Sequence, residues 1–281
     1  MILFKKAKAL TEHLQKLRNQ NVSVGFVPTM GALHNGHISL ITKAKKECDI
    51  VVCSIFVNPV QFNNKNDFEK YPVTIENDIL LLEEIRADIL FLPSVKEIYP
   101  EGTDNLQHFE LDYLENILEG FYRPNHFQGV CNVMHRLLNI VAPDKLFLGQ
   151  KDYQQVLILK KMMQVFHPTI KLFIGETLRE NDGLAMSSRN MRLNNEGRKN
   201  ATTIYKALQY IKQNIEKNSF EELTQHAKKM ILNNRFDKVD YIQICDAKTL
   251  LPVENFDAGE KLIVLVAAYI DDVRLIDNLV L

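Results

Sequence analysis

Two apolar runs separated by a helical pattern constrain the fold of this chain more than any other feature. The runs cover residues 22–27 and 50–57, and such runs are typical of strands buried on both faces of a parallel sheet. Between them, apolar residues recur at helical spacing from Ile38 to Ala44, with lysines left for solvent. Because strand, helix and strand follow one another so closely, the segment predicts a right-handed βαβ unit.

The same alternation continues to about residue 175 and predicts one α/β domain. Helical patterns occur at 75–86, 127–141 and 152–166, and strand patterns at 88–92, 145–148 and 170–174. Repeated alternation of this kind is typical of a Rossmann-like, doubly wound parallel sheet. We therefore expect a first domain over residues 1–176 that binds nucleotide and substrate.

The pattern changes in the last third of the chain. A polar, loop-like segment at 179–195 precedes helical patterns at 195–217 and 220–234 and strand patterns at 239–245, 261–270 and 273–276. These strands are close enough in sequence to pair antiparallel. They predict a smaller C-terminal α+β lid domain over residues 177–281, with a small-molecule site in the cleft between the domains.

Charge and hydropathy exclude several classes of protein. The 34 basic and 35 acidic residues give a net charge of −1, which argues against a large nucleic-acid-binding face. The N-terminus lacks the apolar stretch of a signal peptide, and the longest apolar run, residues 262–270, is too short to cross a bilayer. The four cysteines form no CxxC pair and are expected to be reduced and mostly buried. We expect a soluble cytoplasmic protein without a membrane partner.

The segment His34-Asn35-Gly36-His37 follows the first strand and opens the helix. Residues three apart share a helix face, so both imidazoles can point the same way, and a helix N-terminus with its backbone N–H groups attracts phosphate. The alternative is that one histidine caps the helix while the other packs. A metal site is disfavoured, because no third histidine or cysteine lies at ligand spacing nearby. The position after a strand and a Gly31/Ala32 turn favours a phosphate site.

Polar residues also follow the second and later strands. Asn58 and Gln61 come after the strand at 50–57 and offer neutral groups suited to hydroxyls and carboxylates, although Asn-Pro alone indicates only a turn. Lys151 follows a strand and a glycine turn, where it can act as a point charge on phosphate. Asp152 is either part of the same site or a helix cap, and Gln155 lies one turn further on.

A further cluster, Ser187-Ser188-Arg189, lies in the polar segment after the first domain. Two hydroxyls and a forked cation in a loop are suited to closing on a polyphosphate. The alternative is a solvated linker between domains, and this segment alone does not decide between them.

Taken together, five motifs closely resemble the pantothenate synthetase (pantoate–β-alanine ligase) family, and the similarity runs nearly the whole length of the chain. They are PTMGALHNGH (28–37), FVNPVQF (56–62), FYRPNHFQGV (121–130), GQKDYQQ (149–155) and DGLAMSSRN (182–190). HNGH is similar to the HIGH signature of the wider nucleotidyltransferase superfamily, and MSSR to its KMSKS-type loop.

The resemblance implies a ligase of pantothenate and coenzyme A biosynthesis that uses ATP with Mg²⁺ on its phosphates. Pantoate would form a pantoyl adenylate with release of pyrophosphate, and β-alanine would then displace AMP to form an amide. The implied catalytic residues are His37, His34, Lys151 and Arg189, with His37 as proton donor. Gln61 and Gln155 would bind pantoate, Gln61 also β-alanine, and the enzyme would be a homodimer. No residue is assigned to a metal. The residues implied to line ATP are Met30, Gly31, Ala32, Leu33, His34, Asn35, Gly36, His37, Gly149, Gln150, Lys151, Asp152, Leu178, Met186, Ser187, Ser188 and Arg189.

Four positions depart from the family pattern. Val73 stands where arginine is usual, Asn125 where a small residue is common, Asn132 where threonine is frequent and Asp271 where glycine is usual. None of them is among the implied site residues.

Other functions fit parts of the sequence. Another small-molecule adenylating enzyme, such as a truncated class I aminoacyl-tRNA synthetase, would need a tRNA-binding surface that the net charge disfavours. A nucleotidylyltransferase acting on a phosphate-bearing substrate would need basic residues where this chain has Gln61 and Gln155. A non-enzymatic ATP-sensing module would bind nucleotide without releasing pyrophosphate.

Overall fold

A computed structural model describes residues 1–255, 259 and 261–281. The chain divides into two compact units, one made of residues 1–150 and 155–176, the other of 151–154 and 177–281. The predicted domain boundary at residue 176 stays a prediction, and the structure groups the short segment 151–154 with the C-terminal residues.

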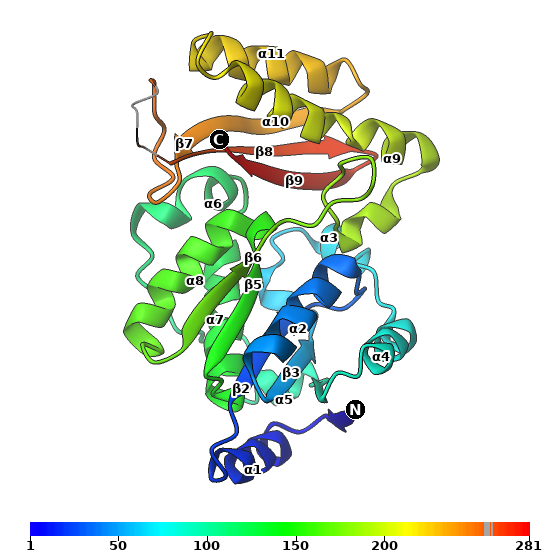
Figure 1. The fold of residues 1–281 in the computed structure, drawn as a ribbon, viewed down its shortest axis with the longest axis vertical. Helices are drawn as coiled ribbons and strands as arrows, with labels where there is room; N and C mark the ends of the chain where they lie inside the picture. Colours follow the sequence, from blue (N-terminus) through cyan, green and yellow to red (C-terminus); the bar gives the residue numbers. More distant parts are fainter. Residues whose placement is uncertain (256–258, 260) are drawn as a thin grey trace. The chain divides into compact units, whose positions relative to one another are not determined.

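The first unit is built on a six-stranded parallel sheet in the order β1-β4-β3-β2-β5-β6 (Figure 1). The predicted α/β class with a doubly wound sheet is confirmed. The chain builds outward from β2 through β3 to β4 and then returns to place β5 on the other side of β2. The strands are β1 (Ile2–Phe4), β2 (Val24–Thr29), β3 (Ile50–Ile55), β4 (Ile89–Phe91), β5 (Lys145–Gly149) and β6 (Lys171–Gly175).

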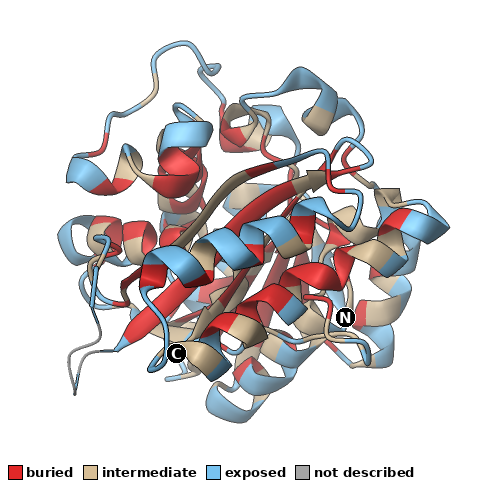
Figure 2. Ribbon diagram, turned by 90° about the horizontal axis from the view of Figure 1, so that it is seen from above, coloured by how far each residue is buried: buried red, intermediate tan, exposed pale blue. Residues whose placement is uncertain are grey.

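The central strands β2 and β3 consist almost entirely of buried residues, and Figure 2 colours the ribbon by the burial of each residue. Val27 on β2 packs in a cluster with Ile41 and Ala44 of α2 and Leu82 of α4. Its neighbour Phe26 points to the opposite face, since strand residues alternate, and is also fully buried. Both faces are therefore covered, which explains why these strands read as apolar runs rather than alternating patterns.

Helices and 3₁₀ turns connect these strands. They are α1 (Ala7–Arg18), α2 (Asn35–Glu47), η1 (Pro59–Gln61), α3 (Lys65–Glu69), α4 (Ile75–Glu84), α5 (Val95–Ile98), η2 (Asp112–Glu115), α6 (Leu118–Tyr122), α7 (His126–Val141), η3 (Gln150–Asp152) and α8 (Tyr153–Phe166). Residues 151–154 of η3 and α8 group with the second unit.

The sequence patterns missed the short elements and one strand end. No pattern indicated β1 or the one-turn helices between residues 93 and 126, because so few residues establish no periodicity. The twelve-residue helix α1 was also missed, although it buries Leu10 and Leu14 at helical spacing. The first strand was expected to stop before Pro28, but β2 continues to Thr29. Proline has no backbone N–H to donate to a neighbouring strand. β5 pairs only with Gly25 and Phe26 of β2, so no β5 residue lies opposite Pro28 and requires that hydrogen bond.

The second unit contains a three-stranded antiparallel sheet in the order β7-β8-β9, as predicted. Apolar residues of α10 and α11 pack with alternate residues of the central strand β8, including Val264 and Val266. The strands are β7 (Lys238–Asp246), β8 (Leu262–Ile270) and β9 (Val273–Val280). The helices are η4 (Ser188–Arg192), α9 (Asn195–Ala201), α10 (Thr203–Asn214) and α11 (Phe220–Leu232). The single helix expected at 195–217 was wrong, because it is divided at Thr202, whose hydroxyl donates to the carbonyl oxygen of Lys199.

The four positions that depart from the family pattern lie in turns, lie on the surface or form hydrogen bonds with nearby backbone. Asp271 and Asp272 form the two-residue turn between β8 and β9, with φ of 52° and 58°. Asn125 has a φ of 64°, a left-handed conformation that asparagine tolerates well. Val73 is exposed, and Asn132 donates to the carbonyl oxygens of Gln107 and Gln128.

Candidate active site

The order of the strands places the first candidate segment at the switch point of the sheet. β2 lies between β3 and β5. From β3 the chain continues to β4 at one side of the sheet, and from β5 it continues to β6 at the other side. In open α/β sheets, ligands bind outside the carboxyl ends of the strands at such a point. Residues 30–37 follow the carboxyl end of β2, and Gly149 ends β5. This part of the candidate site therefore lies where open α/β sheets bind their ligands.

The turn after β2 is held by a buried carboxylate. Gly31 and Ala32 have φ of 82° and 47°, and Asp78 of α4 accepts hydrogen bonds from the backbone N–H groups of Ala32 (2.9 Å) and Leu33 (2.8 Å). The hydroxyl of Thr74 donates to the same carboxylate at 3.0 Å. A Cβ on Gly31 would lie 3.1 Å from Asp78, so glycine lets the turn approach it closely.

The backbone N–H groups of this turn form hydrogen bonds within the protein. The backbone N–H groups of Ala32 and Leu33 bond to Asp78, and that of Gly31 bonds to the hydroxyl of Thr29 at 3.2 Å. A left-handed turn presents consecutive N–H groups as an anion site, and here the anion is a side chain of the protein itself.

His34 and His37 form a reciprocal cap at the start of α2. Nδ1 of His34 accepts from the N–H of Gly36 at 3.2 Å, and Nδ1 of His37 accepts from the N–H of His34 at 3.3 Å. The ring centroids lie 4.0 Å apart. The cap and the phosphate interpretations are therefore compatible: an accepting Nδ1 places the proton of each neutral ring on Nε2, which makes that atom a hydrogen-bond donor.

The second candidate segment is organised by a buried network around Asn58. Its Nδ2 donates to Oε1 of Gln61 (3.2 Å) and to the carbonyl oxygen of Gly129 (3.1 Å). Its Oδ1 accepts from the hydroxyl of Tyr99 (2.9 Å) and from the N–H of Val60 (3.3 Å). The amide of Asn58, expected to be available to a substrate, is thus engaged inside the protein and orients Gln61.

Gln61 itself lies beside the turn after β2. Its Nε2 is 2.9 Å from Sδ of Met30, its backbone carbonyl is 2.7 Å from Nδ1 of His126, and its side chain is buried. Helix α7 passes so close that a Cβ on Gly129 would lie 2.6 Å from the carbonyl oxygen of Val60 and 2.7 Å from Cα of Gln61. Met30 and Gln61, predicted separately, are therefore brought together by the fold of the first unit.

The third candidate segment is divided between the two units. Gly149 and Gln150 end β5 and begin η3 in the first unit, and Gln155 lies in the first turn of α8, partly exposed. Lys151 and Asp152 group with the second unit, where the carbonyl oxygen of Lys151 accepts from Nδ2 of Asn278 at 2.9 Å.

The fourth candidate segment is a bonded turn rather than a loose linker. Leu184, Ala185 and Ser188 are buried, and Met186 donates to the carbonyl oxygen of Leu178 at 3.0 Å. Ser187 caps η4 by accepting from the N–H of Arg189 at 3.3 Å. The solvated-linker interpretation of this segment is therefore wrong, because the second unit buries its apolar side chains.

Sequence reasoning missed Asp78 and Gly129, both of which shape the site. Asp78 lies four residues before Leu82 on the buried face of α4, so a carboxylate within an apolar stripe was the available signal. Gly129 belongs to the motif at 121–130 but was given no role, since its role depends on the distance between α7 and η1.

Burial raises the pKa of two groups near the site, Cys53 and Tyr99. Burial raises the pKa of Cys53 to about 12, which keeps this thiol protonated and unreactive. Burial also raises the pKa of Tyr99, whose hydroxyl donates to Asn58.

Among the residues that the structure describes, no group of three or more histidine, cysteine or acidic side chains is arranged to hold a metal ion. In the same part of the chain, no helix has the length and apolarity needed to cross a bilayer.

Comparisons with known proteins give one consistent family. The family model described as pantoate-beta-alanine ligase matches residues 2–280. A pantothenate synthetase of Cytophaga hutchinsonii is 45% identical over 283 residues, covering 100% of this chain and 99% of the relative. The crystal structure of pantothenate synthetase from Thermus thermophilus has a TM-score of 0.91 and 38% identity, with 99% of both chains covered.

A second solved structure resembles this chain and was determined with ligands. It is a pantoate-beta-alanine ligase from Francisella tularensis complexed with beta-gamma ATP and beta-alanine, with a TM-score of 0.84 and 41% identity over 100% of this chain and 97% of that one. The family model and these full-length similarities agree with the motifs that the site is built from. The chain therefore belongs to the pantoate-beta-alanine ligase family.

Proposed function

We propose that this protein joins pantoate to β-alanine in two half-reactions. In the first, the carboxylate of pantoate attacks the α-phosphorus of ATP, which gives pantoyl adenylate and pyrophosphate. In the second, the amine of β-alanine attacks the acyl carbon, loses a proton and displaces AMP, which leaves the amide bond of pantothenate.

The observation that carries this proposal is the capped histidine pair at the switch point of the sheet. Attack on the α-phosphorus builds negative charge on phosphoryl oxygens and on the leaving pyrophosphate. His34 and His37 begin a helix whose positive dipole end favours that charge, and their Nδ1 bonds orient Nε2–H as donors. The Francisella ligase complexed with an ATP compound and β-alanine supports the same substrates here.

The other roles follow from residue chemistry and from the family. We assign Lys151 and Arg189 to the phosphates together with Ser187 and Ser188. Gln61 and Gln155 are assigned to pantoate, and Gln61 also to β-alanine. Neutral amides suit this role, because they bind hydroxyls without neutralising the carboxylate that must attack. Mg²⁺ enters on the ATP phosphates, where it would offset their charge.

The state of the enzyme is part of the same proposal. We expect a cytoplasmic homodimer, as the family resemblance implies, and a C-terminal domain over residues 177–281 that acts as a lid.

One assay tests the function: release of pyrophosphate and AMP with each substrate omitted in turn. ATP, Mg²⁺ and pantoate without β-alanine should release pyrophosphate, because the adenylate forms, whereas sustained AMP release should need β-alanine. No pyrophosphate from ATP and pantoate would contradict the proposal.

The alternatives predict different results in the same assay. Pyrophosphate release that is equally fast with unrelated carboxylates or needs a phosphate-bearing acceptor would favour another enzyme of the superfamily. ATP binding without pyrophosphate release under any combination would favour a nucleotide-sensing module.

A further inference from the structure

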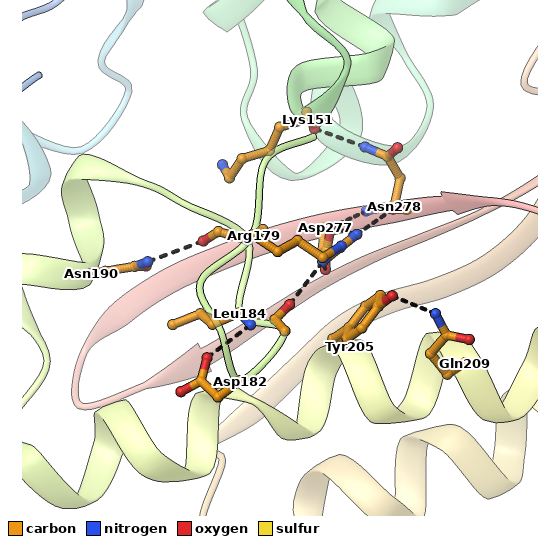
Figure 3. Close-up of polar contacts among 11 residues, drawn as sticks. Lys151, Arg179, Asp182, Leu184, Asn190, Tyr205, Gln209, Asp277 and Asn278 are labelled. Atoms are coloured by element: carbon orange, nitrogen blue, oxygen red, sulfur yellow. Dashed lines mark hydrogen bonds and ion pairs between the residues drawn. The ribbon is translucent and has the colours of Figure 1, made fainter. Parts of the chain in front are cut away.

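A buried ion pair lies at the centre of the polar contacts in the second unit (Figure 3). The guanidinium of Arg179 donates to both carboxylate oxygens of Asp277, at 2.6 and 3.0 Å. It also donates to the carbonyl oxygens of Gly183 and Asn278, each at 3.2 Å, and lies over the ring of Tyr205 with Cζ 3.9 Å from the centroid. A planar fork of donors can make all these contacts at once, which lysine cannot do.

The carboxylate of Asp277 is almost fully buried, with 4% of the residue exposed. Burial raises its pKa, while Arg179 and, at longer range, the ammonium of Lys151 act in the opposite direction. Removing one partner of such a buried pair leaves an uncompensated charge, which is strongly destabilising. Arg179 and Lys151 are therefore the two cations that act on this carboxylate.

On one side, the pair reaches Lys151 through the next residue of β9. An oxygen of the Asp277 carboxylate accepts from the backbone N–H of Asn278 at 2.8 Å. The side-chain amide of Asn278 then donates to the backbone carbonyl of Lys151 at 2.9 Å. Figure 3 shows the Lys151 side chain extending away from this bond, so Asn278 holds the backbone from which the ammonium projects.

On the other side, the same pair reaches the turn that carries Met186 to Arg189. Arg179 forms a β-bridge with Ala185, and its side chain donates to the Gly183 carbonyl oxygen. Asn190 closes the turn by donating to the carbonyl oxygen of Ala185 at 3.0 Å. Gly183 has a φ of 94°, and a Cβ there would lie 2.4 Å from Tyr205, so the turn fits closely against the ring that stacks on Arg179.

We propose that Arg179 and Asn278 are positioning residues for adenylate formation, which set Lys151 and the 182–190 turn in one arrangement through Asp277. The inference rests on the proposed assignment of Lys151 and of the turn to ATP. Neither Arg179 nor Asn278 needs to touch a substrate. Their effect is on the geometry of groups that do, and a small misplacement of such groups is costly for the reaction.

The test compares Arg179→Lys and Asn278→Ala with Lys151→Ala and with the double variant Asn278→Ala/Lys151→Ala. Arg274→Lys is the matched control. Arg274 lies on β9, as Asn278 does, and it donates to a buried carboxylate, as Arg179 does; that carboxylate is Asp240, at 2.9 Å. For each variant, the KM values for ATP and β-alanine, kcat for pyrophosphate release and the melting temperature are measured.

We expect Arg179→Lys and Asn278→Ala each to raise the KM for ATP at least about fivefold. This factor corresponds to the binding free energy that one hydrogen bond typically contributes. The KM for β-alanine should stay within about twofold of wild type in both. Because Asn278 acts through Lys151, adding Asn278→Ala to Lys151→Ala should change the KM for ATP by less than about twofold. Arg274→Lys should lower the melting temperature to a similar extent but leave the KM for ATP unchanged.

Three results would overturn the inference while leaving the proposed function intact. They are an unchanged KM for ATP in both Arg179→Lys and Asn278→Ala, an equal rise in Arg274→Lys, or fully additive effects of Asn278→Ala and Lys151→Ala. Failure of the proposed function would look different, because the wild-type protein itself would then release no pyrophosphate from ATP and pantoate.

Discussion

His34 donates its backbone N–H to Nδ1 of His37 at 3.3 Å, so the ring of the second histidine caps the helix at the first. In each ring, Nδ1 accepts the hydrogen bond of the helix cap, and in the neutral ring Nε2 carries the proton. We propose that Nε2–H donates to a phosphate oxygen. The two roles can be separated by substitution, because asparagine places an amide oxygen close to the position of Nδ1 and has no counterpart of Nε2.

His37→Asn should slow pyrophosphate release at least about tenfold, equivalent to 1.4 kcal/mol of activation free energy. The cap should survive, so the melting temperature should stay close to that of wild type. Stopped-flow detection of pyrophosphate with ATP and pantoate measures the step. His226→Asn, at an exposed position of α11, is the control and should keep the wild-type rate. Unchanged pyrophosphate release in His37→Asn would remove this ring from the mechanism.

Asp78→Asn should weaken both folding and ATP binding. The carboxylate accepts from two backbone N–H groups and one hydroxyl, whereas asparagine turns an N–H₂ group toward one of these donors. The expected loss of stability is about 1–3 kcal/mol in urea denaturation, together with a higher KM for ATP. Thr74→Val removes only the hydroxyl bond and should have the smaller effect on both. Equal effects of the two variants would contradict the role of Asp78 in holding the turn.

Gly129→Ala should impair pantoate binding. The added methyl group would lie 2.6 Å from the carbonyl oxygen of Val60, so η1, with Gln61, must move away from α7. Overpacking of this kind typically costs about 1–3 kcal/mol of stability. We expect a higher KM for pantoate with a nearly unchanged KM for ATP, measured by pyrophosphate release. A variant with wild-type stability and kinetics would show that the contact is easily relieved.

Acid should destabilise the first unit through a pair of histidines outside the site. Nδ1 of His135 lies 3.0 Å from Nε2 of His167, an arrangement that requires one of the two nitrogens to be unprotonated. Burial and, secondarily, the charge of His135 lower the pKa of His167 to about 4. Since the pKa of histidine in an unfolded chain is about 6.5, this contribution to stability is complete above pH 6.5 and is lost as the pH falls toward 4.

The measurement is urea denaturation of wild type and His167→Gln between pH 7.5 and 4.5. The difference in unfolding free energy between the two should shrink by roughly 1–2 kcal/mol across this range, allowing for partial solvent access. Titratable groups that behave alike in both proteins cancel in this difference, which leaves the contribution of His167. A difference that stays constant with pH would contradict the assigned role of His167.

The amino-acid sequence by itself determined the fold class, the reaction family and the chemical types at the site. Buried strands and amphipathic helices differ in period, and period is a local property, so β2, α2 and β3 were evident from residues 22–57 alone. Motifs such as HNGH and MSSR carry their chemistry in adjacent residues and were equally evident.

Only the tertiary structure decided which groups at the site bond to other parts of the protein. Asp78 lies 46 residues from Ala32 in the chain, and Asp277 lies 98 residues from Arg179. A backbone N–H or a carboxylate has the same appearance in the sequence whether it meets a substrate or another part of the protein. The histidine pair illustrates the difference: its position after a strand indicated a phosphate site, but the fold assigned Nδ1 of each ring to the helix cap.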